Sequence, residues 1–144
     1  MTAAGLPLSP LLALDTAGAA STVAVMADGR LLAGDSREMT AGHAEVLPGQ
    51  VQAVLAAAGL APIDISLFGA TVGPGSFTGV RIGLAALAGL ALGAGRPMVG
   101  ITRFALYAAC LPDPGSETRA WVCLDSRRGP VFLQAFDAVA GAWQ

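Results

Sequence analysis

The sequence contains no lysine, because all eight of its basic residues are arginines. A Walker-type phosphate loop, a Schiff base and a lysine general base all need a lysine, so these chemistries are excluded. Charged residues make up only 12% of the 144 residues, and the net charge is −2. Such a chain lacks the strongly basic face that is typical of proteins that bind nucleic acid on their own.

Histidine and cysteine are also scarce. His43 is the only histidine, and together with the nearby Glu45 it is too little for a zinc or iron site. The two cysteines, Cys110 and Cys123, form neither a C-x-x-C pair nor a disulfide framework. We therefore expect no metal site in this chain, and two buried free thiols.

Long hydrophobic runs are missing as well. The longest one lies between Arg81 and Arg96, which is shorter than the roughly 20 residues needed to span a bilayer. The segment from Met1 to Pro10 has no basic residue before its apolar ones, so we expect no secretory signal. The hydrophobic content is nevertheless 54%, which excludes a disordered chain and predicts an apolar surface covered by a partner rather than by a membrane.

Hydrophobic periodicity predicts an α/β lobe. The expected elements are three strands (11–15, 21–27 and 31–36), a helix from shortly before Pro48 to Gly59, a strand (67–72), a helix (78–92), a strand (98–101) and a helix (102–110). Asp28-Gly29 predicts a tight hairpin between the second and third strands. The order βββαβαβα, a meander followed by crossover helices, is typical of the ribonuclease-H-like fold, which includes the actin-like ATPases of the ASKHA class.

The remaining residues predict a second unit. A Pro-Asp-Pro-Gly-Ser stretch within 111–118 is typical of a linker. Two strands are expected after it, at 120–124 and 131–136, with a turn at 127–130. The chain thus divides into an actin-like lobe (1–110), a linker (111–118) and the beginning of a second lobe (119–144), most of which is missing.

Two motifs lie where actin-like ATPases hold nucleotide. Asp15 and Thr16 end the first strand, at the position of an aspartate that in those enzymes helps to bind phosphates and magnesium. The glycine-rich loop that begins with Gly73, Gly75 and Ser76 lies between a strand and a helix N-terminus, as phosphate-binding loops do. A tight turn that brings the helix close to the sheet explains the same glycines. We favour this structural interpretation, in which the five residues are a vestigial nucleotide site.

Two other enzyme classes are not favoured. Ser76 is not part of a G-x-S-x-G elbow, which argues against a serine hydrolase. A ribonuclease-H-like nuclease needs several carboxylates that converge on a metal ion, and only Asp15 and Glu45 are candidates. The sequence therefore predicts no catalytic residue.

The string Gly-Pro-Gly-Ser-Phe-Thr-Gly-Val-Arg-Ile-Gly at 73–83 closely resembles the signature of the bacterial TsaB (YeaZ) family. Three further segments also resemble segments of this family: Leu-Ala-Leu-Asp-Thr-Ala at 12–17, His-Ala-Glu-Val-Leu-Pro at 43–48 and Asp-Ser-Arg-Arg-Gly at 125–129. The resemblance covers about 11–136. It departs at Pro130 and Phe132, where Glu and Tyr are usual. The short second lobe fits a truncated product, an expressed fragment or a shortened variant.

The resemblance implies a function in tRNA modification. It implies a non-catalytic subunit that dimerises with a TsaD-type catalytic subunit, is joined by a TsaE-type ATPase, and supports threonylcarbamoyl transfer to the adenosine next to the anticodon of tRNA. By the same resemblance, ATP and metal belong to the partner subunits, tRNA is met only through the complex, the chain alone forms a homodimer, and the location is the cytoplasm.

The alternative is an enzyme of the same fold, either an ATPase or kinase or a peptidase of the glycoprotease-like M22 group. The catalytic subunits use two histidines, four residues apart, for a metal. Here Leu47 stands at the second of these positions, four residues after His43. This departure and the missing lysine argue against the enzyme alternative.

The helix expected at 78–92 carries two kinds of apolar position. Bulky residues at 80, 84 and 87, with Ala91, are expected to face the sheet. A stripe of small residues on another side of the helix consists of Gly79, Gly83, Ala86 and Gly93. A glycine in a helix costs up to about 1 kcal/mol relative to alanine. This stripe predicts the close approach of a partner helix, unless it only packs the neighbouring helix of the same chain. The expected partner contacts are His43, Val46, Leu47, Gly79, Gly83, Ala86 and Gly93.

Overall fold

Strand β1 (Leu11–Asp15) lies at the centre of a five-stranded sheet in a computed structural model that describes residues 9–39, 41–126 and 129–144. The sheet order is β3-β2-β1-β4-β5. The other strands are β2 (Ala20–Ala27), β3 (Arg30–Glu38), β4 (Leu67–Thr71) and β5 (Met98–Ile101). Strands β1, β2 and β3 pair antiparallel, as expected, whereas β4 pairs parallel with β1 and β5.

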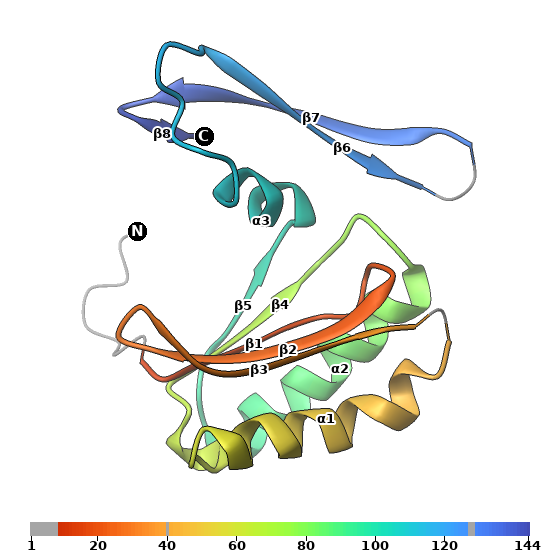
Figure 1. The fold of residues 1–144 in the computed structure, drawn as a ribbon. Helices are drawn as coiled ribbons and strands as arrows, with labels where there is room; N and C mark the ends of the chain where they lie inside the picture. The colour runs from red at the N-terminus through yellow and green to blue at the C-terminus, as the bar shows by residue number, and fades with distance from the viewer. Residues whose placement is uncertain (1–8, 40, 127–128) are drawn as a thin grey trace.

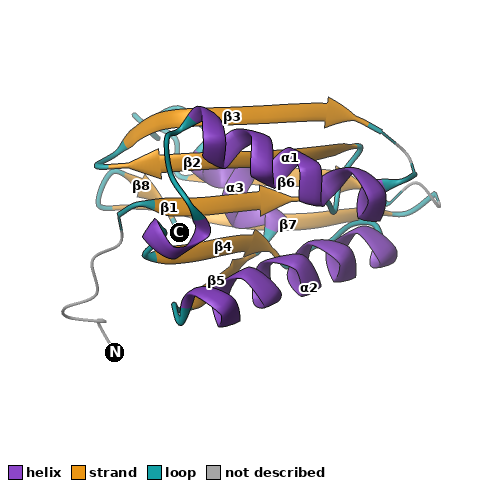
Figure 2. Cartoon of the chain, turned by 90° about the horizontal axis from the view of Figure 1, so that it is seen from below, coloured by secondary structure: helices purple, strands orange, loops and turns teal. Residues whose placement is uncertain are grey.

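Two long helices cover one face of this sheet and lie side by side (Figures 1 and 2). They are α1 (His43–Ala57) and α2 (Phe77–Ala94), and a short 3-10 helix, η1 (Pro62–Asp64), precedes β4. Inward side chains of β1, β2 and β4 alternate with outward ones, because successive residues of a strand point to opposite faces. The inward residues and the buried sides of both helices form one core.

A second, three-stranded sheet follows helix α3 (Arg103–Ala109) on the other side of the molecule (Figure 1). Its order is β6-β7-β8, from β6 (Arg119–Asp125), β7 (Val131–Val139) and β8 (Ala142–Trp143). Ala108 of α3 packs against Val122, Leu124 and Phe136 in a small separate core. Helix α3 therefore joins the two sheets.

The predicted order of strands and helices is confirmed, with α2 beginning at Phe77 and β3 extending from Arg30 to Glu38. Asp28 and Gly29 both have positive φ, as the predicted hairpin requires. Most of the segment from Met1 to Pro10 and the turn predicted at Arg127-Arg128 lie outside the described residues.

The longest apolar run in the sequence begins after Arg81. The helix itself begins earlier, at Phe77, so Arg81 lies inside it and the apolar helical segment is longer than that run. By length and hydropathy alone, this 18-residue helix would be long enough to cross a membrane. One side of it packs on the sheet, with Gly79, Gly83, Leu87 and Ala91 buried. The opposite side of the helix is exposed.

The expectation of buried thiols is wrong, since Cys110 and Cys123 are both exposed. Cys110 lies at the C-terminal cap of α3. Cys123 lies on the side of β6 opposite to the buried Val122 and Leu124, because side chains alternate along the strand.

A buried glutamine fixes α1 on the sheet. Gln50 is fully buried; its Oε1 accepts a hydrogen bond from Ser21 Oγ (2.6 Å) and its Nε2 donates to the carbonyl oxygens of Ser21 (2.9 Å) and Asp35 (3.1 Å). Replacing it with leucine leaves the buried Ser21 hydroxyl without this partner.

We expect Gln50→Leu to lower the free energy of unfolding by about 2–4 kcal/mol, because a network of buried hydrogen bonds is lost. Urea unfolding measures this change. Gln134→Leu, at an exposed position of β7, is the matched control and should change it by less than about 0.5 kcal/mol. Equal effects of the two substitutions would show that the Gln50 network contributes nothing.

Candidate functional site

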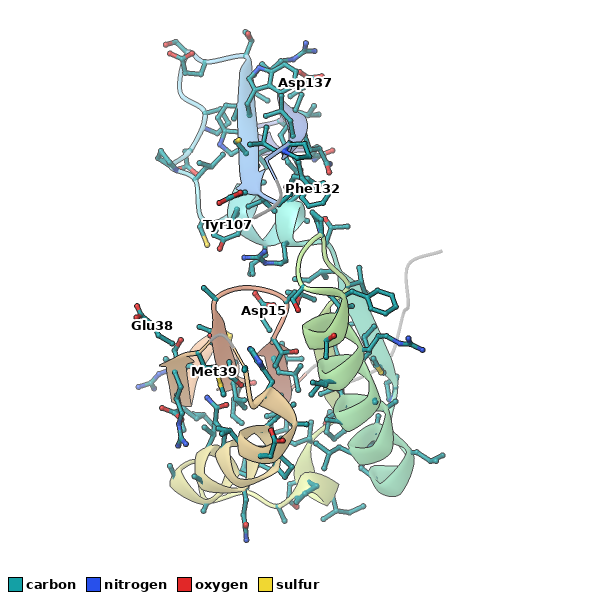
Figure 3. All side chains as sticks on the ribbon, turned by 90° about the vertical axis from the view of Figure 1, so that its right-hand side faces the viewer. Asp15, Glu38, Met39, Tyr107, Phe132 and Asp137 are labelled. Atoms are coloured by element: carbon teal, nitrogen blue, oxygen red, sulfur yellow. The ribbon has the colours of Figure 1, made fainter. Side chains whose placement is uncertain are left out.

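Asp15 is held in place by groups of its own chain. Its Oδ1 accepts hydrogen bonds from Thr71 Oγ1 (2.6 Å) and from the backbone N–H of Ala17 (2.8 Å). Its Oδ2 lies 3.4 Å from Nε of Arg103. Figure 3 shows Asp15 at the end of the first lobe that faces Tyr107. The carboxylate therefore has two hydrogen bonds and one ion pair without any ligand.

The glycine-rich loop also uses its polar groups internally. The N–H of Ser76 donates to the carbonyl oxygen of Ala17 (2.8 Å), and Ser76 Oγ accepts from the N–H of Gly79 (3.1 Å), which caps α2. The carbonyl oxygens of Gly73 and Pro74 accept from Arg103. These bonds support the structural interpretation of the loop as a tight connection.

Three glycines let α2 approach the end of β1. A Cβ atom at Gly75 would overlap the carbonyl oxygen of Ala17, and one at Gly79 would overlap the carbonyl oxygen of Thr16. A Cβ atom at Gly83 would overlap the Thr16 side chain, whose hydroxyl donates to the Gly79 carbonyl (2.7 Å). The prediction that placed Gly79 and Gly83 on a side of α2 away from the sheet is therefore wrong, because close packing on Thr16 requires glycine there.

The other residues expected to touch a partner are spread over three environments. His43 and Leu47 are buried, and Nε2 of His43 has no hydrogen-bond partner among the described residues. Val46 and Ala86 are half-buried, and Ala86 packs against the core. Gly93 is exposed. Expecting His43 and Leu47 on an accessible surface was wrong, because α1 turns both toward the sheet.

The outward sides of α1 and α2 carry small, apolar residues with few charges. We call them the helix surface: Ala44, Glu45, Pro48, Gly49, Gln52, Ala53, Ala56 and Ala57 from α1, and Thr78, Arg81, Ala85, Ala88, Gly89, Leu92 and Gly93 from α2. Leu92 is 85% exposed. A Cβ atom at Gly49, Gly89 or Gly93 would meet none of the described residues within 4 Å. These three glycines therefore have no packing function in the described part of the chain.

A cleft lies between the end of the five-stranded sheet and the unit that α3 forms with the second sheet. Its volume is about 1400 Å³, and its lining includes Asp15, Ser76, Arg103, Tyr107, Trp121 and Phe132. Figure 3 places Tyr107 and Phe132 on the side of the second sheet, across from Asp15. Among the described residues, no group of three or more His, Cys, Asp or Glu side chains is arranged to hold a metal ion.

Comparison with known proteins gives a consistent result. The family model described as "TsaD: tRNA N6-adenosine threonylcarbamoyltransferase" matches residues 37–141. The tRNA threonylcarbamoyladenosine biosynthesis protein TsaB of Escherichia coli K12 is 39% identical over 125 residues, which cover 85% of this chain and 52% of that protein. The tRNA N6-adenosine threonylcarbamoyltransferase of Jannaschia is 42% identical over 66 residues, which cover 46% of this chain and 18% of that protein.

A solved structure shows the same fold. The structure of YeaZ from Pseudomonas aeruginosa matches with a TM-score of 0.78 and 30% identity, over 94% of this chain and 63% of that chain. The chain spans about half the length of the TsaB protein it matches.

Proposed function

Since the chain belongs to the TsaB (YeaZ) family, we propose that it works as a non-catalytic partner subunit in the threonylcarbamoyl modification of the adenosine next to the anticodon of tRNA. In this proposal it dimerises with a TsaD-type catalytic subunit, and a TsaE-type ATPase joins the pair. ATP and metal are held by the partner subunits, tRNA is contacted through the complex, and the assembly works in the cytoplasm. Alone, the chain forms a homodimer through the same surface.

The helix surface is the observation that carries this proposal. Glycine within a helix costs up to about 1 kcal/mol relative to alanine, so glycines without a packing function in their own chain call for another reason. Gly49, Gly89 and Gly93 face open space, and Glu45 and Arg81 are the only charged residues of the surface. A partner helix could approach such a surface closely and bury it. We therefore propose that the partner packs on α1 and α2.

The same fold in an enzyme would require a usable site at Asp15. Here the carboxylate, the Ser76 N–H and the Gly73 and Pro74 carbonyls are bonded within the chain, and no lysine is present. These bonds favour the partner subunit over the ATPase, kinase or peptidase alternative. We also assign the first lobe to the ribonuclease-H-like, actin-like class, an assignment supported by the sheet order β3-β2-β1-β4-β5.

We expect the isolated chain to form no threonylcarbamoyladenosine and to hydrolyse neither ATP nor peptides, because the Ser76 N–H and the Asp15 carboxylate already have partners. Product formation on tRNA should depend on adding the TsaD-type subunit of the same organism. Liquid chromatography of digested tRNA and phosphate release measure the two activities. Turnover by the chain alone that disappears in Asp15→Asn, with folding retained, would favour the enzyme alternative instead.

A further inference from the structure

Arg103 connects three parts of the molecule. It is the first residue of α3, and its backbone N–H donates to the carbonyl oxygen of Gly73 (2.7 Å). Its Nη1 donates to the carbonyl oxygen of Pro74 (3.1 Å), and its Nε lies 3.4 Å from Oδ2 of Asp15. Because α3 packs against β6, this one residue links the second sheet to the glycine-rich loop and to the end of β1.

The surroundings of the guanidinium group are adapted to it. The side chain of Arg103 is only 12% exposed, and that of Asp15 is 20% exposed. Nη2 donates to the Tyr107 hydroxyl (3.2 Å), and the group lies over the Tyr107 ring, 5.5 Å from its centre. Gly18 leaves room for it, since a Cβ atom there would lie 2.9 Å from Nη2. The first lobe thus has a fitted place for this cation.

The contact with Asp15 is one of charge more than of hydrogen bonding. Arg103 Nε is buried and makes no hydrogen bond to any residue that the structure describes, and the carboxylate at 3.4 Å compensates its charge. A buried cation without such compensation is costly. In return, the guanidinium group neutralises an aspartate that lines the cleft.

Without Arg103, the same place would offer oxygen ligands to a hard cation. The Asp15 carboxylate and the Pro74 carbonyl, which both contact the guanidinium group, are oxygen groups of the kind that magnesium and calcium prefer. We propose that Arg103 is a built-in cation, which takes the place of a metal ion beside Asp15 and holds the cleft in one geometry without a bound ligand. Arg103 is then a positioning residue, and the cleft needs no metal to keep its shape.

Arg103→Ala tests this proposal through the melting temperature, with and without about 10 mM MgCl₂ and with ionic strength matched by NaCl. The melting temperature of the unmodified chain should not respond to magnesium. Arg103→Ala should melt lower, and magnesium should raise its melting temperature by about 3 °C, because the ion now binds the folded state. The double variant Arg103→Ala/Asp15→Asn should lose this response.

Arg103→Lys is the matched control, since it keeps a positive charge and should show no response to magnesium. Methylguanidinium is the second probe, because it resembles the missing group in both shape and charge. A rise with methylguanidinium but none with magnesium would overturn the proposal, since it would mean that shape and hydrogen bonds matter but cation binding does not. If Arg103→Ala does not fold without a cation, recovery of folded protein on adding magnesium supports the proposal, and no recovery overturns it.

Discussion

Gly89→Arg is expected to abolish association of the chain with a TsaD-type subunit while the monomer stays folded. Gly89 lies on the helix surface, and a Cβ atom there meets nothing within 4 Å, so the isolated chain has room for the larger side chain. Arginine is also a better helix former than glycine. In a complex formed through α1 and α2, the same arginine would be desolvated without a partner, which costs about 3–5 kcal/mol, or more than about 100-fold in affinity.

Size-exclusion chromatography with light scattering measures the association, and circular dichroism checks that the variant is folded. Ser116→Arg adds the same charge at an exposed loop position and should associate like the unmodified chain. Gly89→Arg is preferable to a charge at Ala86, because Ala86 is half-buried against the core and an arginine there would disturb the monomer itself. Undiminished association of a folded Gly89→Arg would place the partner elsewhere.

Gly79→Ala is expected to destabilise the monomer strongly, by about 2–4 kcal/mol or more, because the added methyl group would overlap the carbonyl oxygen of Thr16. The nearby backbone has little freedom to move, since the N–H of Gly79 is bonded to Ser76 Oγ and its carbonyl to the Thr16 hydroxyl. For a protein whose total stability is about 5–15 kcal/mol, such a change is a large fraction.

Gly89→Ala is the matched control in the same helix. It should raise the free energy of unfolding by about 0.5–1 kcal/mol, because alanine is the better helix former and nothing obstructs its methyl group. Urea unfolding of both variants gives the comparison. Similar effects of the two substitutions would mean that Gly79 is not a packing requirement, and that α2 does not approach Thr16 as closely as described.

Most of the fold could be predicted from the sequence, because its signals are local. The Asp28-Gly29 turn, the alternation along β1 and β2, and the helical spacing around Val51 and Val54 each depend on a few neighbouring residues. The side of α2 that faces the sheet was predicted only in part. Leu87 and Ala91 are buried as expected, but nearer the start of the helix β1 is so close that Gly79 and Gly83 occupy the core side in place of bulky residues.

The site depended even more on contacts between distant residues. The sequence identified Asp15 as a candidate site residue. Its ion pair with Arg103 joins residues that are 88 positions apart, and no sequence motif predicts this pair. Gly89 was missed as a surface residue because the stripe of small residues on α2 was drawn from the wrong reference positions. Gly79 and Gly83 are buried and mark the side of α2 that faces the sheet. The residues on the opposite side of the helix are therefore the ones that lie on the surface.

Hydrogen–deuterium exchange of the chain, with and without the TsaD-type subunit of the same organism, tests the central claim most directly. We expect a stable complex in which backbone amides of α1 and α2 exchange more slowly than in the free chain diluted to its monomeric state, while β6 and β7 are unchanged. Failure to form a complex, or protection confined to the cleft around Asp15 and Tyr107 with none on α1 and α2, would contradict it.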